Sequence, residues 1–539
     1  GSTWTTNSLT ETRKDDYHVT SQVIANYMGT FGSHDLTVMA GFENYYMKDE
    51  ELTAARDKYE LTGYPYLNIG SEDFQTNSGK GSEYTSNSVF GRVIYSYADR
   101  YLFQANIRHD GSSRFAKGYR WGTFPSFSAG WVMSEEKFMK SLNWDWLSFL
   151  KLRGSWGILG NERIGDDYFP YIALMSFGNS LFYMADGSVV SDKTARPAIL
   201  AVEDITWETT TSTDFGLDAN FFNNRLQFHF DYYWKQTKDM LLKIEIPYFM
   251  GYNNPNTNAG KMSTHGYDIE LAWNDRIGDL QYGVNVNFSD FLSKIDYMND
   301  GEQISNGKIK RAGVLFNEYY GYVCDGIYQT QEEVNNSART STTVTVGDLK
   351  YRDISGPDGV PDGIISPEYD RVPLGNSLPR FQYGGTFNAS YKGIDFSIAF
   401  QGIGKQNSYL STAMVQPLRD NYGSVPSIIE GKYWSPFNTA EENLSARYPR
   451  LSNVSKSNNY ATSNFWMFNG SYFRLKNLTL GYTLPETWTQ KAGIDRVRFY
   501  ISGSDLFCLS NFPDGWDPEM GASSYPITTS LVMGLQVNF

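Results

Sequence analysis

Alternation of apolar and polar residues is the strongest signal in this sequence. Between Leu226 and Trp234 every second side chain is apolar or aromatic, and Gln227, His229 and Asp231 lie among the positions between them. A β-strand places successive side chains on opposite faces, so this pattern predicts a strand with one apolar and one polar face. The same period recurs at 282–289, 381–391, 394–401 and 531–539. We expect an all-β chain of about 15 to 17 strands.

The connections between these expected strands are of two kinds. Short turns are expected at Gly32-Ser33, Asp99-Arg100, Asn223-Asn224 and Lys392-Gly393. Long polar loops are expected at 48–85, 158–205, 239–260 and 403–470. Short turns at one end and long loops at the other are typical of an outer-membrane barrel, so the fold expected is a transmembrane antiparallel β-barrel. The alternative is a soluble sandwich or propeller, although no blade-length repeat is visible.

Three local expectations complete this interpretation. The segment from Ser134 to Leu147 is the one plausible helix, on the side of the short turns. Near Asn477 the apolar phase slips by one residue, as a β-bulge requires. The terminal strand ends at Phe539, which we expect at the periplasmic rim.

The strand count and the first residues bear on domain organisation. Parity from both ends requires an odd number of strands, whereas a single-chain bacterial barrel closes with an even number. The opening GSTWTTNSLTETRKDD has neither the basic nor the apolar region of a secretory signal. We therefore expect residues 1–539 to be the C-terminal part of a larger barrel, with the N-terminal signal not included.

Charge and composition narrow the function classes. Lys plus Arg number 46 against 60 Asp plus Glu, a net charge of −14, which disfavours an electrostatic nucleic-acid binder. The chain has no apolar run of the roughly 18 residues that a membrane helix needs. Aromatic residues make up 16% of the chain although its mean hydropathy is −0.45. Cys324 and Cys508 stand alone in the sequence and are expected to be unpaired.

Catalytic signatures are not found. The sequence contains no nucleophile elbow, P-loop, dinucleotide fingerprint or HExxH zinc motif. The five histidines are scattered singly, and they are His18, His34, His109, His229 and His265. We therefore expect that the protein is not an enzyme and assign no catalytic residue.

One acidic segment has the composition of a cation site. Asp353, Asp358, Asp362 and Asp370 occur at short intervals in DISGPDGVPDGIISPEYD. Calcium takes several carboxylate and carbonyl oxygens, and the glycines of this segment permit tight turns. The prolines disturb the spacing of an EF-hand, and Asp-Gly pairs are also ordinary turn residues. A structural calcium site at the four aspartates and a plain turn are both open.

Aromatic residues of the expected long loops are a second candidate for binding. They are Tyr168, Phe169, Tyr171, Phe182, Tyr183, Tyr319 and Tyr320. Such rings stack on sugars or pack on peptides, but they also hold long loops together or form the aromatic girdle of a membrane barrel. No single substrate-binding residue follows from the sequence.

Seven segments carry a resemblance to a known family. They are DGSSRFAKGYRWGTFPSFSAGWVMSEEKFMK (110–140), LKLRGSWGILGN (150–161), WETTTSTDFGLDANFFNNRLQFHFDYYWKQTKDMLL (207–242), NAGKMSTHGYDIEL (258–271), GDLKYRDISGPDG (347–359), YFRLKNLTLGYTLP (472–485) and DPEMG (517–521). In this order they resemble the barrel of SusC/RagA-type TonB-dependent transporters, over roughly residues 86–539. The resemblance implies a plugged barrel of about 22 strands in the outer membrane of Bacteroidota. We expect the N-terminal extension and plug domain of that family not to be included in residues 1–539.

The resemblance also implies a function and partners. Such transporters import oligosaccharides or peptides, take energy from TonB, sit in outer-membrane lipid and work with a SusD-like surface lipoprotein. A passive porin or a surface-adhesion β-barrel is the alternative from another class. A plug domain upstream of residue 1 would favour import, and a bare signal peptide would favour a porin. Whether the substrate is a glycan or a peptide does not follow from the sequence.

Overall fold

The computed structural model describes residues 7–539 except 62, 166, 300, 412–414, 420–424, 514 and 521–523. Contacts divide the chain into two compact units, which are described separately. Unit 1 comprises Gly1–Glu136, Leu152–Phe215 and Trp234–Ser263, and unit 2 comprises Lys137–Lys151, Gly216–Tyr233 and Thr264–Phe539. Part of the loop expected at 403–470 lies outside the described residues.

The principal sheet has 15 strands in the order β1-β2-β3-β4-β5-β6-β9-β10-β11-β12-β19-β20-β23-β24-β25. Its strands are β1 (Ser8–Phe31), β2 (His34–Asp57), β3 (Gln75–Tyr97), β4 (Tyr101–Ser112), β5 (Trp121–Val132), β6 (Leu147–Asn161), β9 (Glu208–Phe221), β10 (Leu226–Lys243), β11 (Asn256–Ile277), β12 (Leu280–Met298), β19 (Arg380–Tyr391), β20 (Ile394–Lys405), β23 (Tyr472–Thr483), β24 (Arg496–Ser510) and β25 (Ser530–Asn538). The strand pairs for which a register is described are antiparallel, as in β1 with β2 and β24 with β25. The expected all-β architecture and strand number are confirmed.

Smaller elements occupy the long connections. Four further sheets are formed by β7 (Met175–Tyr183) with β8 (Val189–Pro197), by β13 (Glu302–Ser305), β14 (Lys308–Arg311), β15 (Glu318–Tyr322) and β18 (Arg371–Asn376), by β16 (Cys324–Ile327) with β17 (Leu349–Tyr351), and by β21 (Asn407–Tyr409) with β22 (Met467–Asn469). The α-helices are α1 (Lys137–Ser141), α2 (Gln331–Asn335), α3 (Ala440–Leu444), α4 (Lys456–Asn459) and α5 (Glu486–Thr489). Among the described residues, no helix is long and apolar enough to span a membrane.

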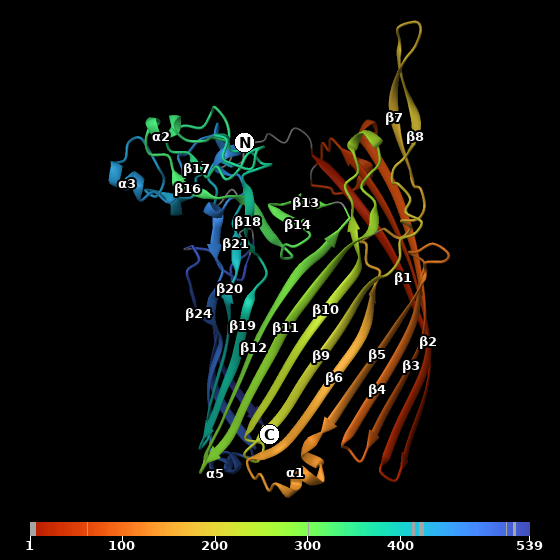
Figure 1. The fold of residues 1–539 in the computed structure, drawn as a ribbon, viewed down its shortest axis with the longest axis vertical. Coiled ribbons are helices and arrows are strands. Elements are labelled where there is room, and N and C mark those ends of the chain that lie inside the picture. Colours follow the sequence, from red (N-terminus) through yellow and green to blue (C-terminus); the bar gives the residue numbers. More distant parts are fainter. Residues whose placement is uncertain are drawn as a thin grey trace. The chain divides into compact units, whose positions relative to one another are not determined.

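Unit 2 has two different ends. The strands β12, β19, β20, β23 and β24 run side by side, with α2, α3, β16 and β17 gathered at one end and α5 and the C-terminus at the other (Figure 1). At the α5 end β19 passes to β20 through Lys392 and Gly393, both with positive φ, which suits a tight hairpin. The opposite end carries the connections from β12 to β19 and from β20 to β23. The expected asymmetry of the connections is confirmed within this unit.

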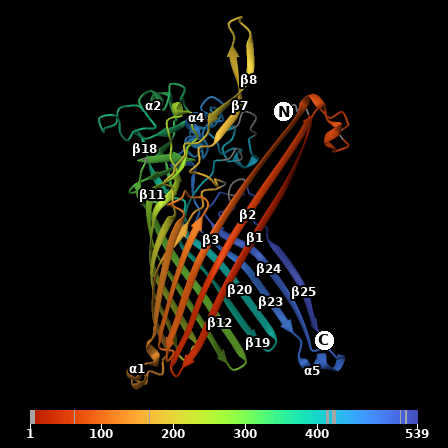
Figure 2. The ribbon, with the colours of Figure 1, turned by 90° about the vertical axis from the view of Figure 1, so that its right-hand side faces the viewer.

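Unit 1 shows the same asymmetry. Strands β1, β2 and β3 lie side by side, and the β1–β2 turn is at the end of this unit opposite the β7–β8 hairpin (Figure 2). Side chains in this unit alternate between two faces of the sheet, as strand β4 shows. Tyr101, Phe103 and Ile107 are exposed, while Gln104 and Asn106 point to the other face and are hydrogen-bonded to each other.

Two sequence-based expectations need correction. The segment 134–147 forms only the five-residue α1 after a short 3₁₀ turn, because Asn143 adopts a left-handed conformation (φ 48°) that ends the helix. The loop expected at 48–85 is confined to 58–74, since β2 and β3 continue through most of that range as paired strands. The slip near Asn477 is confirmed as a register shift between Leu475 and Asn477.

Candidate functional site

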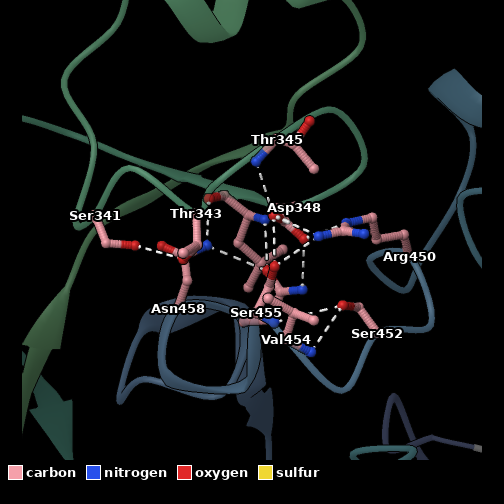
Figure 3. A network of polar contacts seen from close by, with 11 residues as sticks. Ser341, Thr343, Thr345, Asp348, Arg450, Ser452, Val454, Ser455 and Asn458 are labelled. Atoms are coloured by element: carbon pink, nitrogen blue, oxygen red, sulfur yellow. Dashed lines mark hydrogen bonds and ion pairs between the residues drawn. The ribbon is translucent and has the colours of Figure 1, made fainter.

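At the loop-rich end of unit 2, Asp348 joins two segments that are about a hundred residues apart in sequence. This carboxylate is fully buried and accepts a hydrogen bond from Arg450 Nε at 2.7 Å (Figure 3). It also accepts from the hydroxyl of Ser455 at 2.8 Å, from Asn459 Nδ2 at 3.0 Å and from the Thr345 backbone N–H at 2.9 Å. A buried carboxylate with this many donors is well satisfied, so it fixes segment 345–349 against 450–459.

The neighbouring asparagines extend this connection. Asn459 Oδ1 accepts from the Leu349 N–H at 2.9 Å, Asn458 Nδ2 donates to the Leu349 carbonyl at 2.9 Å, and the Tyr351 hydroxyl donates to the Asn458 carbonyl at 2.6 Å. Tyr351 stacks on Tyr322 with ring centroids 5.0 Å apart. Burial raises the pKa of Tyr351 well above its usual value, so it stays a neutral donor. The long connections of unit 2 therefore form an ordered platform.

The acidic segment lies in the same unit, and its aspartates serve the backbone. Asp370 is fully buried, and its carboxylate accepts from the N–H groups of Ile354 at 2.7 Å, Ser355 at 3.2 Å and Ser366 at 2.7 Å. This pattern closes the segment into a compact loop. It is the role that aspartate commonly has in turns.

The other three predicted ligands are placed differently. Asp353 Oδ2 accepts from the Gly363 N–H at 2.7 Å, Asp362 Oδ1 accepts from the Ile364 N–H at 2.9 Å, and Asp358 is exposed. Over the described part of the chain, no group of three or more His, Cys, Asp or Glu side chains is arranged to hold a metal ion. These contacts support the turn interpretation, and the calcium site stays a prediction.

A second candidate lies in unit 1, where β1, β2 and β3 are longer than a membrane crossing requires. β1 has 24 residues, whereas a transmembrane strand needs about 9–11. The odd-numbered positions of β1 are mostly apolar from Tyr17 to Phe31. Directly before Tyr17 the odd-numbered positions are charged, with Arg13 and Asp15. We call the stretch from Tyr17 to Phe31 the apolar band. The strands continue beyond it for several residues.

A charged cavity of about 360 Å³ lies in this extension and is lined chiefly by β1, β2 and β3. Lys14, Glu51 and Lys80 are consecutive cross-strand neighbours. Lys14 Nζ is 3.1 Å and Lys80 Nζ is 3.5 Å from the Glu51 carboxylate. Asp16 and Asp49 form the cross-strand pair two positions further along the same face and also line the cavity. The cavity therefore has an ordered arrangement of both charge signs.

Aromatic rings continue from the cavity along the same strands. Tyr168 lines the cavity and lies 6.2 Å from Tyr84, which is 5.9 Å from Tyr45 between ring centroids. His18 Nδ1 and the Tyr45 hydroxyl are hydrogen-bonded at 2.8 Å. Arg114 lies over Tyr168, 4.4 Å from its centroid. These side chains form a row of polar-tipped rings beside the charged cavity.

Sequence reasoning found only part of this second site. Tyr168 was a predicted loop aromatic, but Tyr319 and Tyr320 are buried, as in the interpretation that such rings hold loops together. Phe182 and Tyr183 are exposed on the β7–β8 hairpin. The cavity side chains do not stand out in the sequence, because the pattern at 48–85 predicts a loop where the structure has paired strands. The signal for them is cross-strand charge pairing, which requires the register.

The family described as TonB dependent receptor-like, beta-barrel, matches residues 1–502. This chain belongs to that family. It is accordingly β-barrel sequence of an outer-membrane receptor that belongs to a transporter family, and it is not an enzyme.

Two curated relatives show which members of the family this chain is similar to. TonB-dependent receptor P3 of Formosa agariphila is 29% identical over 557 residues, covering 96% of this chain and 52% of the relative. TonB-dependent receptor SusC of Bacteroides thetaiotaomicron is 28% identical over 541 residues, covering 97% of this chain and 50% of the relative. The chain thus spans about half the length of the curated relatives it matches.

A solved structure supports the same fold. The RagAB peptide transporter matches with a TM-score of 0.81 at 23% identity, covering 99% of this chain and 57% of that one. At this identity the structural likeness shows the fold alone. The SusC/RagA resemblance seen in the sequence motifs is confirmed.

Proposed function

We propose that this chain is the barrel of an outer-membrane importer of oligosaccharides or peptides that works with a SusD-like surface lipoprotein. The observation that carries the proposal is the contrast between the two ends of unit 2. One end has tight turns, and the other has long connections held in order by the buried Asp348 network. An ordered loop platform is suited to docking a partner.

The expectation of a partner protein comes from a solved structure with the same fold. RagAB is a peptide importer that has been solved in 'open-open' and 'closed-closed' states. By analogy, a RagB/SusD-like protein would dock on the loop platform of this chain and cover the lumen. The polar faces of the strands would line the path beneath it. On these faces Asn285 donates a hydrogen bond to Glu270, and Ser397 donates one to Asn388.

Orientation and energy coupling belong to the same proposal. The short-turn end, with α5 and the C-terminus, would face the periplasm, as in outer-membrane barrels generally. The complete protein would take energy from TonB, and its barrel would be embedded in outer-membrane lipid.

The test uses the complete native protein. We expect purification from membranes under mild conditions to yield a surface lipoprotein in constant proportion. Deletion of the gene should abolish growth on at least one glycan or peptide, and loss of TonB should have the same effect. A preparation without lipoprotein, together with unchanged growth across a broad glycan and peptide panel, would instead favour a passive porin or an adhesion barrel.

A further inference from the structure

We propose that the charged cavity between β1, β2 and β3 binds the ammonium or guanidinium group of a Lys or Arg residue in a peptide substrate. The inference rests on the proposed import function and narrows its substrate class. It is carried by two aspartates of the cavity that have no close cation partner among the described residues, by adjacent tyrosine rings and by the place of the cavity beyond the apolar band.

The charge balance of the cavity is the first step. Glu51 is paired with two lysines, Lys14 and Lys80, which together leave one positive charge over, and Glu50 has Lys48 at 2.9 Å. Asp16 and Asp49 remain. Over the described residues Asp16 forms no ion pair, and the buried Oδ1 atom of Asp49 has no hydrogen-bond partner, with His18 Nε2 at 4.0 Å. The three lysines and four carboxylates together carry a net charge of −1, and the two aspartates are the carboxylates left without a cation closer than 4.0 Å in the described part of the chain. Such acceptors favour a positively charged ligand.

The tyrosine rings beside the cavity also favour a cationic ligand. A cation is attracted to the face of an aromatic ring, and the attraction is stronger where water is excluded. Tyr168 contributes its ring to the cavity wall, and the chain's own Arg114 already lies over that ring. Tyr84 and Tyr45 continue the row away from the cavity. A peptide whose basic residue enters the cavity would then pass its neighbouring residues along this row.

Size and position are the third step. A volume of about 360 Å³ is within the range of small-ligand sites and holds a side chain rather than a whole oligomer. The β1 residues that line the cavity, Lys14 and Asp16, lie within three residues of Tyr17, where the apolar band begins. A substrate would meet it before reaching the membrane-embedded part of the strands. The acidic net charge of −14 adds a general attraction for basic ligands.

The experiment measures binding to the complete transporter with its native lipoprotein. The probes are three nine-residue peptides that are identical except for Lys, Arg or norleucine at the central position, and a neutral oligosaccharide of similar mass. We expect the Lys and Arg peptides to bind at least about tenfold more tightly than the norleucine peptide, with the preference falling at high salt.

Matched variants assign the preference to the cavity. Asp49→Asn and, separately, Asp16→Asn should each reduce the preference for the basic peptides about tenfold and leave the norleucine peptide unchanged. Glu302→Gln removes the same charge from an exposed ion pair with Arg311 in unit 2 and should change nothing. Heat-modifiability of each variant verifies that the barrel is assembled, and two independent variants guard against a folding defect in one.

The outcomes separate the two proposals. Equal affinity for basic and norleucine peptides, selective binding of the oligosaccharide, or an intact preference in both aspartate variants would overturn the cavity assignment. Import that continues without any charge preference would remove the inference and leave the proposed function standing. A charge-dependent binding that is lost in the variants, in a protein that imports nothing, would support the cavity and contradict the proposed function.

Discussion

Phe230 and His229 are sequence neighbours in β10 with opposite surroundings. Phe230 lies at the centre of the apolar positions 226–234, while His229 Nδ1 is 3.0 Å from Asp218 on β9. We expect Phe230→Arg to place a charge against lipid at a cost of about 2–4 kcal/mol near the midplane. His229→Arg, the matched control, introduces the same side chain on the polar face beside Asp218 and should change stability little. Heat-modifiability and the amount of assembled barrel measure both, and equal tolerance would contradict the lipid-facing assignment.

Cys324 is a free thiol whose chemistry is set by burial. Loss of solvent raises its pKa to about 11, above the usual value for cysteine. The reactive thiolate is therefore scarce at pH 8 and becomes abundant only as the pH rises towards 11. We expect slow alkylation by iodoacetamide at pH 8 in the folded protein. A cysteine introduced at the exposed hairpin tip, Ser188→Cys, should react much faster, and equal rates would show that Cys324 is accessible.

At the scale of elements, the acidic loop tests the calcium hypothesis. Asp370→Ala leaves three backbone N–H groups without their acceptor, and we expect a cost of about 1–3 kcal/mol for each unsatisfied buried donor, with the total reduced by relaxation. Faster proteolysis of segment 353–370 is the measurement. If calcium protects the unmodified loop and a chelator removes that protection, the calcium prediction is correct. If neither has an effect, the aspartates serve only the turn.

A second prediction at this scale concerns the hydrogen bonds of Asp348, which we expect to stabilise the loop platform. Asp348→Ala leaves the half-buried guanidinium of Arg450 without its carboxylate, and we expect a loss of about 3 kcal/mol in the local stability of the platform. Segments 345–349 and 450–459 should then become protease-sensitive together. Glu302→Ala removes an exposed partner of Arg311 and should cost under about 1 kcal/mol. Independent cleavage of the two segments would show that Asp348 does not couple them.

At the scale of the whole molecule, the last residue is expected to serve assembly. Phe539 follows β25 at the α5 end of unit 2 and is 87% exposed, so packing does not explain an aromatic residue there. We expect deletion of Phe539 to lower the amount of assembled barrel in the outer membrane. Phe539→Tyr retains the ring and should assemble normally. Unchanged levels after the deletion would remove this role.

Much of the fold could be predicted because alternation is a local property. The pattern at 226–234 and at 531–539 reflects a strand with two different environments, and no distant contact is needed to read it. The bulge near Asn477 was visible for the same reason. The helix predicted at 134–147 is longer than the five-residue α1, which ends just before Asn143 in its left-handed conformation.

The candidate sites depended on contacts that sequence spacing does not contain. The sequence by itself determined an antiparallel strand protein with one short-turn end, the resemblance to SusC/RagA-type barrels, and the four aspartates of the acidic loop. Only the tertiary structure decided that Asp370 serves backbone donors, that Asp348 meets Arg450, and that Lys14, Glu51 and Lys80 pair across three strands. The physical reason is that register and loop closure set which side chains share a space, and both arise from long-range pairing.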